Sequence, residues 1–364
     1  MRGTGTLRKS AVIAAVCLAG LCVLGCGKPT PEQVAERTKL LYEAIEMDNL
    51  EQAKSCIKAG ADVNKGGNTA LWLAAGRDST DMIKLLIKSK SNVNGKSDKG
   101  YTALMNAVQQ GKTDIAKLLI KSGADVNAKT NEGKTVLMFA KDKETGELLI
   151  KSKADVNAKN RYGQTALMLV ADKNNNNEGM AEVLIKLDAD VNAKNNDGKT
   201  ALMYAVDNFW ELNKDMVELL IKSGADVNAK DSSGKTVLMH AIRFDWDNSK
   251  TIKALIEAGA DVNAKDENGS TALMLARHVN KARLLIKAGA DVNARNIHGN
   301  TAIMRVDSSS GSASGFSWGK DVDMVKFLIE AGADLHIRNN KGQTALMLAD
   351  GMPEYILQEA GARY

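Results

Sequence analysis

The chain is poor in the residue types that mark several common classes of protein. Only 4% of its 364 residues are aromatic and only three are proline, which argues against a carbohydrate cleft lined by stacked rings and against proline-rich linkers. All four cysteines lie within the first 56 residues, so neither a disulfide framework nor a zinc cluster can be built along the chain. The remaining composition, 44% hydrophobic and 26% charged, is typical of a folded protein.

Residues 1–25 have the composition of an export signal. They contain three basic residues and no acidic residue, and an apolar run occupies residues 11–24. A run of this length is shorter than the roughly 20 residues that a membrane-spanning helix needs. A polar segment follows it, so the sequence predicts a secretory signal peptide.

The apolar run ends in Val23-Leu24-Gly25-Cys26. This ending resembles the lipobox of bacterial lipoproteins, in which the cysteine is lipidated and becomes the first residue of the mature protein. Leu24 is bulkier than the motif usually has, and ordinary cleavage or an uncleaved anchor are the alternatives. The resemblance implies that lipidated Cys26 attaches the protein to a membrane of the bacterial cell envelope. Because Gly27 stands where Asp would favour the inner membrane, it further implies an outer-membrane location facing the periplasm.

The formal net charge of +5 depends largely on this segment. Without residues 1–25, 46 basic residues face 44 acidic ones, and the charge of the mature chain falls to about +2. A net charge this small gives no support for general binding to nucleic acid, so no nucleic-acid partner is predicted.

From about residue 34 onward, two signatures alternate along the chain. One is Asn-Ala-Lys-x-x-x-Gly-x-Thr-Ala-Leu-Met and the other is Leu-Leu-Ile-Lys-x-Gly-Ala-Asp-Val-Asn. Successive threonines of the first signature are 33, 33, 30, 35, 36, 35, 30 and 43 residues apart, a spacing that indicates a repeat array. These threonines are Thr69, Thr102, Thr135, Thr165, Thr200, Thr236, Thr271, Thr301 and Thr344.

Residues 100–127 resemble an ankyrin repeat almost position by position. They contain Gly-x-Thr-Ala-Leu-Met from Gly100, then Gly111, then Leu-Leu-Ile-Lys-Ser-Gly-Ala-Asp-Val-Asn from Leu118. The Thr-Pro-Leu-His of the family is replaced here by Thr-Ala-Leu-Met, which removes the proline and the histidine of the usual turn. The resemblance implies an all-α solenoid of about ten helix-turn-helix units joined by hairpin fingers, which binds proteins without catalysis.

The residues of one repeat account for this expected structure. The threonine hydroxyl can cap a first helix that buries Ala, Leu and Met, and a second helix buries Ile or Val, Leu, Leu and Ile at helical spacing. A lysine near the end of the second helix suits its negative pole, and a glycine then ends that helix. Because neither helix can bury its apolar face alone, neighbouring repeats are expected to stack.

The predicted organisation has five segments. A signal peptide at residues 1–25 precedes a lipidated linker at 26–33 and an N-terminal capping repeat at 34–64. Central repeats occupy 65–336, and a C-terminal capping repeat occupies 337–364. We number the repeats 1 to 10, with Thr69 in repeat 2 and Thr344 in repeat 10, and call the hairpin that leads into each first helix the finger of that repeat. The array is expected to be monomeric.

Differences in length between the repeats fall between each threonine and the end of its repeat, where the count varies from 23 to 36 residues. The sequence therefore places the variation in the inter-helix tips, which carry three of the four tryptophans. These aromatics form either a ridge that binds a partner or local packing over the short repeat 8. They are Phe209, Trp210, Phe244, Trp246, Phe316 and Trp318.

A basic residue occupies the same position in successive fingers. Stacked helices lie roughly 8–10 Å apart, about one Debye length in physiological salt, so a long anion could contact several of these charges at once. The alternative is that each lysine simply solvates its finger. The residues of this basic row are Lys96, Lys129, Lys159, Lys194, Lys230, Lys265, Arg295 and Arg338.

Finger residues are the other candidates for binding a protein partner. In ankyrin proteins the fingers and inner helices often carry the contacts, and the resemblance extends this role to Tyr101, Tyr162, Ile297 and His298. The occurrences of Gly-Lys-Thr lack the earlier glycine of a phosphate-binding loop, and no two of the four histidines are four residues apart. The sequence therefore predicts no catalytic residue, no metal site and no cofactor.

Overall fold

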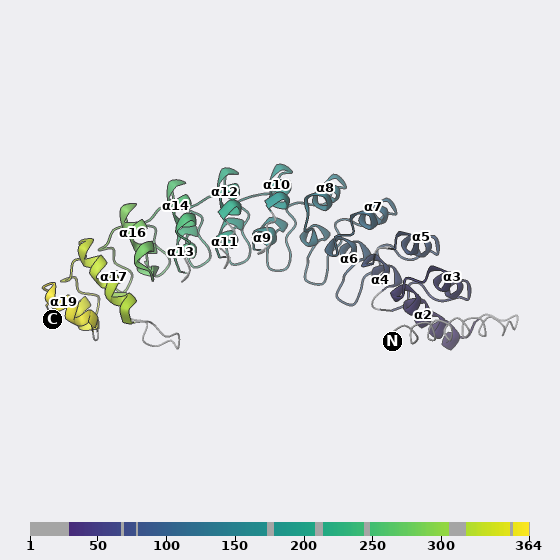
Figure 1. The fold of residues 1–364 in the computed structure, drawn as a ribbon, viewed down its shortest axis with the longest axis horizontal. Coiled ribbons are helices and arrows are strands. Elements are labelled where there is room, and N and C mark those ends of the chain that lie inside the picture. Colours follow the sequence, from purple (N-terminus) through teal and green to yellow (C-terminus); the bar gives the residue numbers. More distant parts are fainter. Residues whose placement is uncertain are drawn as a thin grey trace, which may run out of the picture. The chain divides into compact units, whose positions relative to one another are not determined.

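The computed structural model in Figure 1 describes residues 29–66, 69–77, 79–172, 178–207, 214–243, 248–305, 318–349 and 352–363. The side chains of residues 318–321 and 352 are outside this description. The chain divides into two compact units, residues 1–161 and residues 162–364, called here the N-terminal unit and the C-terminal unit. The predicted segments place no boundary between residues 161 and 162.

The N-terminal unit is built from four helix pairs, one for each of repeats 1 to 4. The first helices α2, α4, α6 and η1 pack against one another in order, and the second helices α3, α5, α7 and α8 do the same. The pairs are α2 (Pro31–Glu46) with α3 (Leu50–Lys58), α4 (Ala70–Ala75) with α5 (Thr80–Lys88), α6 (Ala103–Gln109) with α7 (Thr113–Lys121), and the 3-10 helix η1 (Val136–Phe139) with α8 (Lys143–Lys151).

The C-terminal unit continues the pattern through repeats 5 to 10. Helices α9, α11, α13 and α15 pack in order, as do α10, α12, α14, α16 and α17. The pairs are α9 (Ala166–Ala171) with α10 (Glu178–Lys186), α11 (Ala201–Val206) with α12 (Lys214–Lys222), α13 (Val237–Ile242) with α14 (Ser249–Glu257), α15 (Ala272–Leu275) with α16 (Val279–Lys287), the 3-10 helix η3 (Ile303–Arg305) with α17 (Trp318–Glu330), and α18 (Ala345–Leu348) with α19 (Met352–Glu359).

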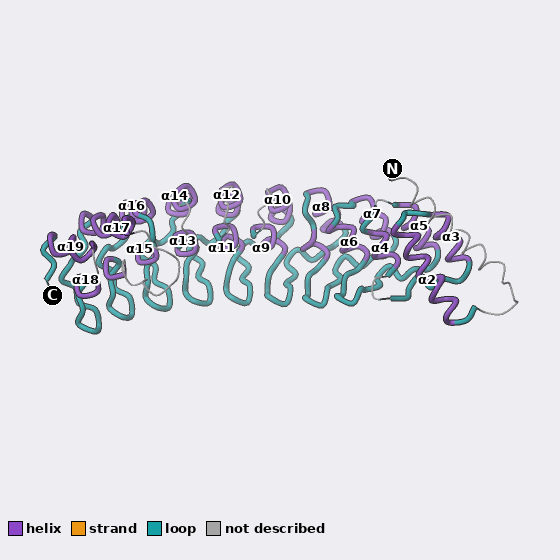
Figure 2. The backbone as a smooth tube through the Cα atoms, turned by 60° about the horizontal axis from the view of Figure 1, so that its bottom comes forward, coloured by secondary structure: helices purple, strands orange, loops and turns teal. Residues whose placement is uncertain are grey.

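Both units are helical solenoids, which confirms the predicted fold class. In each unit the fingers extend beyond the first helices, on the side away from the second helices (Figure 2). In the described ranges, β-type pairing is limited to two isolated bridges, Lys129 with Thr135 and Lys230 with Thr236. No helix in those ranges is long and apolar enough to cross a membrane.

The predicted threonine caps are present where the first helix is of full length. The hydroxyl of Thr200, for example, accepts a hydrogen bond from the backbone N–H of Met203 at 3.4 Å. Met203 itself is fully buried, and burying a side chain of this size contributes about 1.5–3 kcal/mol. The methionine at this position is buried in repeats 3 to 9 and 38% exposed only at Met347, whose repeat is the last of the stack.

Repeats 4 and 8 refine the expectation about length. Their inner helices η1 and α15 have four residues each, against six or seven in repeats 2, 3, 5, 6 and 7. The backbone turns extended at Ala140 and Ala276, directly after each short helix. Repeats 4 and 8 are therefore shorter because they lack the last turn of the first helix, as well as residues of the inter-helix tip.

The second helices end as predicted, with one addition. A glycine with positive φ follows most of them, as at Gly224 (φ 86°). Where glycine is missing, Lys90, Lys153 and Asp188 adopt the same left-handed conformation, with φ of 63°, 70° and 66°. The stacking geometry thus imposes the left-handed turn even on residues that it strains.

At the N-terminus the first helix starts earlier than the predicted boundary. Helix α2 begins at Pro31, inside the segment assigned to the linker, and Thr30 forms a capping box with Gln33. Proline fits the first helical position because its missing N–H would have no partner there in any case.

Candidate interaction surface

Each finger is a tight hairpin that its own backbone and one polar side chain close. In the finger of repeat 7, the Asp231 N–H donates to the Lys235 carbonyl at 3.0 Å. The Asp231 carboxylate accepts the backbone N–H groups of Ser233 and Lys235 at 2.8 and 2.9 Å. A short polar side chain at this position therefore supplies the acceptor that fixes the turn.

Glycine is required at the turn because the next finger passes close to it. Gly198 has φ of 74°, and a Cβ added there would lie 2.7 Å from the backbone nitrogen of Ser232. Gly234 has φ of 73°, and its added Cβ would lie 2.8 Å from the nitrogen of Glu267. Neighbouring fingers are thus in backbone contact, closer than any side chain would allow.

Backbone hydrogen bonds join the tips of successive fingers. Within the C-terminal unit, an N–H of each finger donates to a carbonyl of the preceding finger, at 2.8–3.1 Å. These bonds run from Asn196 to Tyr162, Ser232 to Asp197, Glu267 to Ser233, Ile297 to Asn268 and Asn340 to His298. The finger tips therefore form a linked row rather than a set of independent loops.

A second set of bonds joins the bases of the fingers. The Asn228 side chain donates to the carbonyl of Gly259 at 3.0 Å and accepts the N–H of Asp261 at 2.7 Å, both in the following repeat. This double role is shared by Asn64, Asn94 and Asn127 in the N-terminal unit and by Asn192, Asn228, Asn263 and Asn293 in the C-terminal unit, all at the last position of the Asp-Val-Asn signature, which reads Asn-Val-Asn at Asn94.

The basic row takes part in the same linkage. All eight of its residues lie at the surface. Five of them donate to the carbonyl of the equivalent residue in the next finger, at 2.8–3.0 Å: Lys96 to Lys129, Lys194 to Lys230, Lys230 to Lys265, Lys265 to Arg295, and Arg295 to Arg338. These bonds give the row a structural role and leave further N–H groups on each cation for an anion.

The predicted finger residues differ in how accessible they are. Tyr162 and Ile297 are 46% and 55% exposed, and both lie on fingers of the C-terminal unit. His298 is also exposed, next to Ile297. Tyr101 is half-buried, and its ring centroid lies 5.4 Å from that of Phe139 in the following repeat. Some of the Tyr101 ring is therefore used for packing between repeats.

The predicted aromatic tips and the lipidation site lie largely outside the described residues. Phe209, Trp210, Phe244, Trp246 and Phe316 fall in the undescribed segments, as does Cys26. Trp318 begins helix α17, but its side chain is not described. The choice between a binding ridge and local packing remains a prediction.

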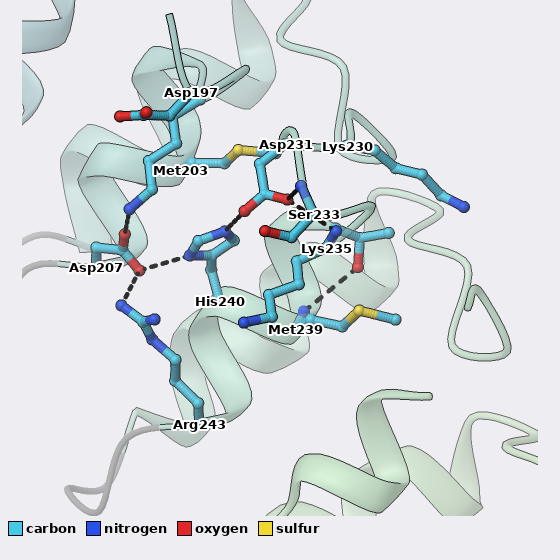
Figure 3. Close-up of polar contacts among 12 residues, drawn as sticks. Asp197, Met203, Asp207, Lys230, Asp231, Ser233, Lys235, Met239, His240 and Arg243 are labelled. Atoms are coloured by element: carbon cyan, nitrogen blue, oxygen red, sulfur yellow. Dashed lines mark hydrogen bonds and ion pairs between the residues drawn. The ribbon is translucent and has the colours of Figure 1, made fainter. Parts of the chain in front are cut away.

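A buried charged cluster links repeats 6 and 7, and the sequence did not predict it. His240 on α13 is 2% exposed, and its Nδ1 lies 2.9 Å from Asp207 Oδ1 at the end of α11 (Figure 3). Its Nε2 lies 2.9 Å from Asp231 Oδ2 in the finger of its own repeat. Lys199 and Arg243 contact the Asp207 carboxylate at 2.7 and 3.3 Å.

The surroundings of Asp207 and Asp231 favour the ionised form of both carboxylates. Burial by itself raises the pKa of Asp207 and of Asp231, but their hydrogen bonds outweigh that effect and both pKa values are lowered. The lowering comes from His240 for both, with Lys199 for Asp207 and backbone N–H groups for Asp231. Because carboxylate oxygens only accept, the geometry fits an imidazolium ring that donates from both nitrogens.

One signal in the sequence could have identified this cluster. The residue four positions after the threonine faces the residue that opens its own finger: Tyr204 Oη accepts from Asn195 Nδ2 at 3.0 Å in repeat 6, just as His240 meets Asp231 in repeat 7. A histidine and an aspartate at these two positions therefore predict a contact. In the described ranges no cluster of His, Cys, Asp and Glu has the arrangement of a metal site.

Family models of ankyrin repeats match most of the chain. The model of three ankyrin repeats matches residues 40–130, 90–160, 136–231 and 212–296, and the single-repeat model matches residues 298–340. The chain belongs to the ankyrin-repeat family. Ankyrin repeats indicate a protein–protein interaction scaffold, which agrees with the hydrogen-bonded row of fingers described above.

The ankyrin identity also explains what the surface is built to do. Fingers, finger bases and inner helices repeat along each unit, so a single partner can contact equivalent positions on several repeats. A search of curated proteins finds no match for this ankyrin chain.

Proposed function

We propose that this protein is a non-catalytic ankyrin scaffold, attached to the bacterial cell envelope through a lipid on Cys26, that binds a protein partner along its fingers. The observation that carries the proposal is the exposure of Tyr162 and Ile297 on fingers that backbone hydrogen bonds hold in place. An apolar side chain on a preorganised element loses little conformational entropy when a partner covers it.

The aromatic inter-helix tips form a second region of the proposed surface. Tryptophan concentrates binding energy when an interface buries it. The sequence assigns Trp210 and Trp246 to inter-helix tips, and Trp318 begins helix α17 directly after a third tip. Changing each to alanine separates the two roles predicted for them. A binding ridge loses the partner at an unchanged melting temperature, whereas local packing lowers the melting temperature.

Site-specific crosslinking in native cells tests the scaffold directly. A photo-crosslinking residue at position 162 or 297 should capture a distinct protein, identified by mass spectrometry. The matched control is position 253, where Lys253 is exposed on the outer helix α14 away from the fingers. Equal capture from position 253, or no adduct from either finger, contradicts the proposal.

The membrane attachment has a separate test. Cells grown with labelled palmitate should incorporate the label into the wild-type chain and not into a Cys26→Ser variant. Fractionation of the envelope then places the labelled protein in the outer membrane, as the glycine after Cys26 favours. A wild-type chain without label overturns the lipid anchor and leaves the scaffold proposal to the crosslinking experiment.

Binding of an anionic envelope polymer or lipid through the basic row is the second candidate. It is favoured by the eight cations at one position of successive fingers. Steep loss of binding with added salt supports it, because exposed charges are screened beyond about one Debye length. A partner that binds equally in low and high salt eliminates this candidate.

A further inference from the structure

A polar hollow lies between the last two fingers of the C-terminal unit. Its volume is about 400 Å³, and the fingers of repeats 9 and 10 form its walls. Met304 and Leu348, from the first helices of these repeats, contribute an apolar lining. None of the described residues that line it is acidic.

The backbone fixes the orientation of one amide in this hollow. Asn339 is 8% exposed, and its Oδ1 accepts the backbone N–H groups of Lys341 and Gln343 at 2.9 and 3.0 Å. A backbone N–H can only donate, so this end of the Asn339 amide must be the oxygen. The other end is therefore the NH₂ group.

Asn339 in turn orients two neighbouring amides. Its Nδ2 donates to Asn300 Oδ1 at 3.0 Å and to Gln343 Oε1 at 3.2 Å. The amide oxygens of Asn300 and Gln343 thus face Asn339, and the NH₂ group of each of these two side chains is the end that does not contact Asn339. Among the described residues, neither Asn300 Nδ2 nor Gln343 Nε2 has a hydrogen-bond partner.

The hollow is therefore rich in donors and carries positive charge. Besides the two NH₂ groups, Lys341 and His298 line it, and the Lys341 side chain is exposed. In the sequence, Asn300 and Gln343 are the one pair of adjacent fingers in which both carry an amide directly before the threonine. The other adjacent fingers pair an amide with lysine, tyrosine or serine, or have no amide at this position.

We propose that this hollow binds a carboxylate group with an aliphatic substituent. Two amide NH₂ groups can donate to the two carboxylate oxygens, one ammonium balances one negative charge, and the apolar lining accommodates the substituent. A phosphate, with a charge close to −2, matches a single lysine less well. The carboxylate belongs either to a free organic acid or to the C-terminus of a peptide.

Calorimetric titration of the full-length chain tests this assignment. The probes are N-acetyl-leucine, which resembles a peptide C-terminus, 4-methylpentanoate, which resembles a free acid, and N-acetyl-leucinamide, which keeps the shape of the first without the charge. At least one acid should bind and the amide should not. Binding of N-acetyl-leucine alone identifies a peptide C-terminus as the source, and binding of 4-methylpentanoate alone identifies a free acid.

Two variants locate the binding. Lys341→Gln removes the ammonium from an exposed side chain, and Asn300→Asp replaces a donor with a carboxylate. Each should weaken acid binding about tenfold or more, the effect of losing one charge-assisted hydrogen bond. The control is Lys235→Gln in the finger of repeat 7, which should bind as wild type, and circular dichroism verifies that all three remain folded.

Three results overturn the proposal: equal binding of acid and amide, no saturable binding of either acid at millimolar concentration, or acid binding that Lys341→Gln and Asn300→Asp leave unchanged. None of these outcomes bears on the protein scaffold, which the crosslinking experiment tests at other residues.

Discussion

Replacing His240 with leucine should destabilise repeats 6 and 7 while leaving their packing intact. Leucine occupies the equivalent position in repeats 5 and 8, at Leu169 and Leu275, so its shape is compatible with the inner helix. What His240→Leu removes is the donor between two carboxylates whose side chains are 12% and 7% exposed, those of Asp207 and Asp231.

The expected loss of stability in His240→Leu depends on the partners that each carboxylate retains. Removing one partner of a buried ion pair costs about 3–5 kcal/mol, because a charge is left buried without compensation. Asp207 retains Lys199 and Arg243, and Asp231 retains two backbone N–H groups. We therefore expect the lower end of the range, about 3 kcal/mol at pH 7.

Hydrogen exchange of the full-length chain, measured repeat by repeat, is the suitable assay because repeat arrays open locally rather than all at once. Protection in α11 and α13 should fall in His240→Leu, while protection in the N-terminal unit stays as in wild type. Adding Asp207→Asn and Asp231→Asn to His240→Leu should restore much of the loss, since no buried charge then lacks a partner. A cost below about 1 kcal/mol, or a triple variant less stable than the single one, refutes this reasoning.

The same cluster predicts a pH dependence. The pKa values of Asp207 and Asp231 are lower in the folded chain than in the unfolded chain. The two ionised carboxylates therefore contribute their full stability above the unfolded-state pKa of about 3.9. This stability is lost as the pH falls through their lower, folded-state pKa values. Asn228→Ala removes two exposed hydrogen bonds between repeats and should cost about 1–2 kcal/mol in urea unfolding, with Ser232→Ala near zero. Lys153→Gly relieves a left-handed lysine and should stabilise repeat 4 by about 1 kcal/mol in thermal unfolding. Gly198→Ala should lower the free energy of unfolding by at least about 1 kcal/mol more than Gly224→Ala does. Both glycines have positive φ, but only a Cβ at position 198 would clash with the next finger. Equal losses of stability contradict this close approach.

Features set by neighbours in the chain were predictable from the sequence. Thr200 caps its helix through a residue three positions later, and the finger that Asp231 closes spans five residues. The repeat length, the helix pair and the buried methionine ladder depend on such short spacings and on helical periodicity, so they were predicted and confirmed. Family models bear out the same assignment over most of the chain.

Features that depend on the distance between repeats became visible only in three dimensions. The spacing of the stack brings the next finger's backbone to 2.7 and 2.8 Å from a Cβ added at Gly198 and Gly234. It also makes lysines of the predicted row donors to carbonyls of the next finger. The same spacing brings His240 to Asp207, 33 residues earlier, and Asn339 to the amide of Asn300, 39 residues earlier.

The sequence by itself determined which residues form each repeat, because capping, turn formation and helical periodicity act over a few residues. Tertiary structure decided which polar groups meet across repeats, because a hydrogen bond or ion pair forms only when atoms some 30 or 40 positions apart come within about 3 Å. His240 illustrates the difference: its place on an inner helix and its contact with Asp231 of the same repeat follow from the repeat pattern, whereas its contact with Asp207 of the preceding repeat does not.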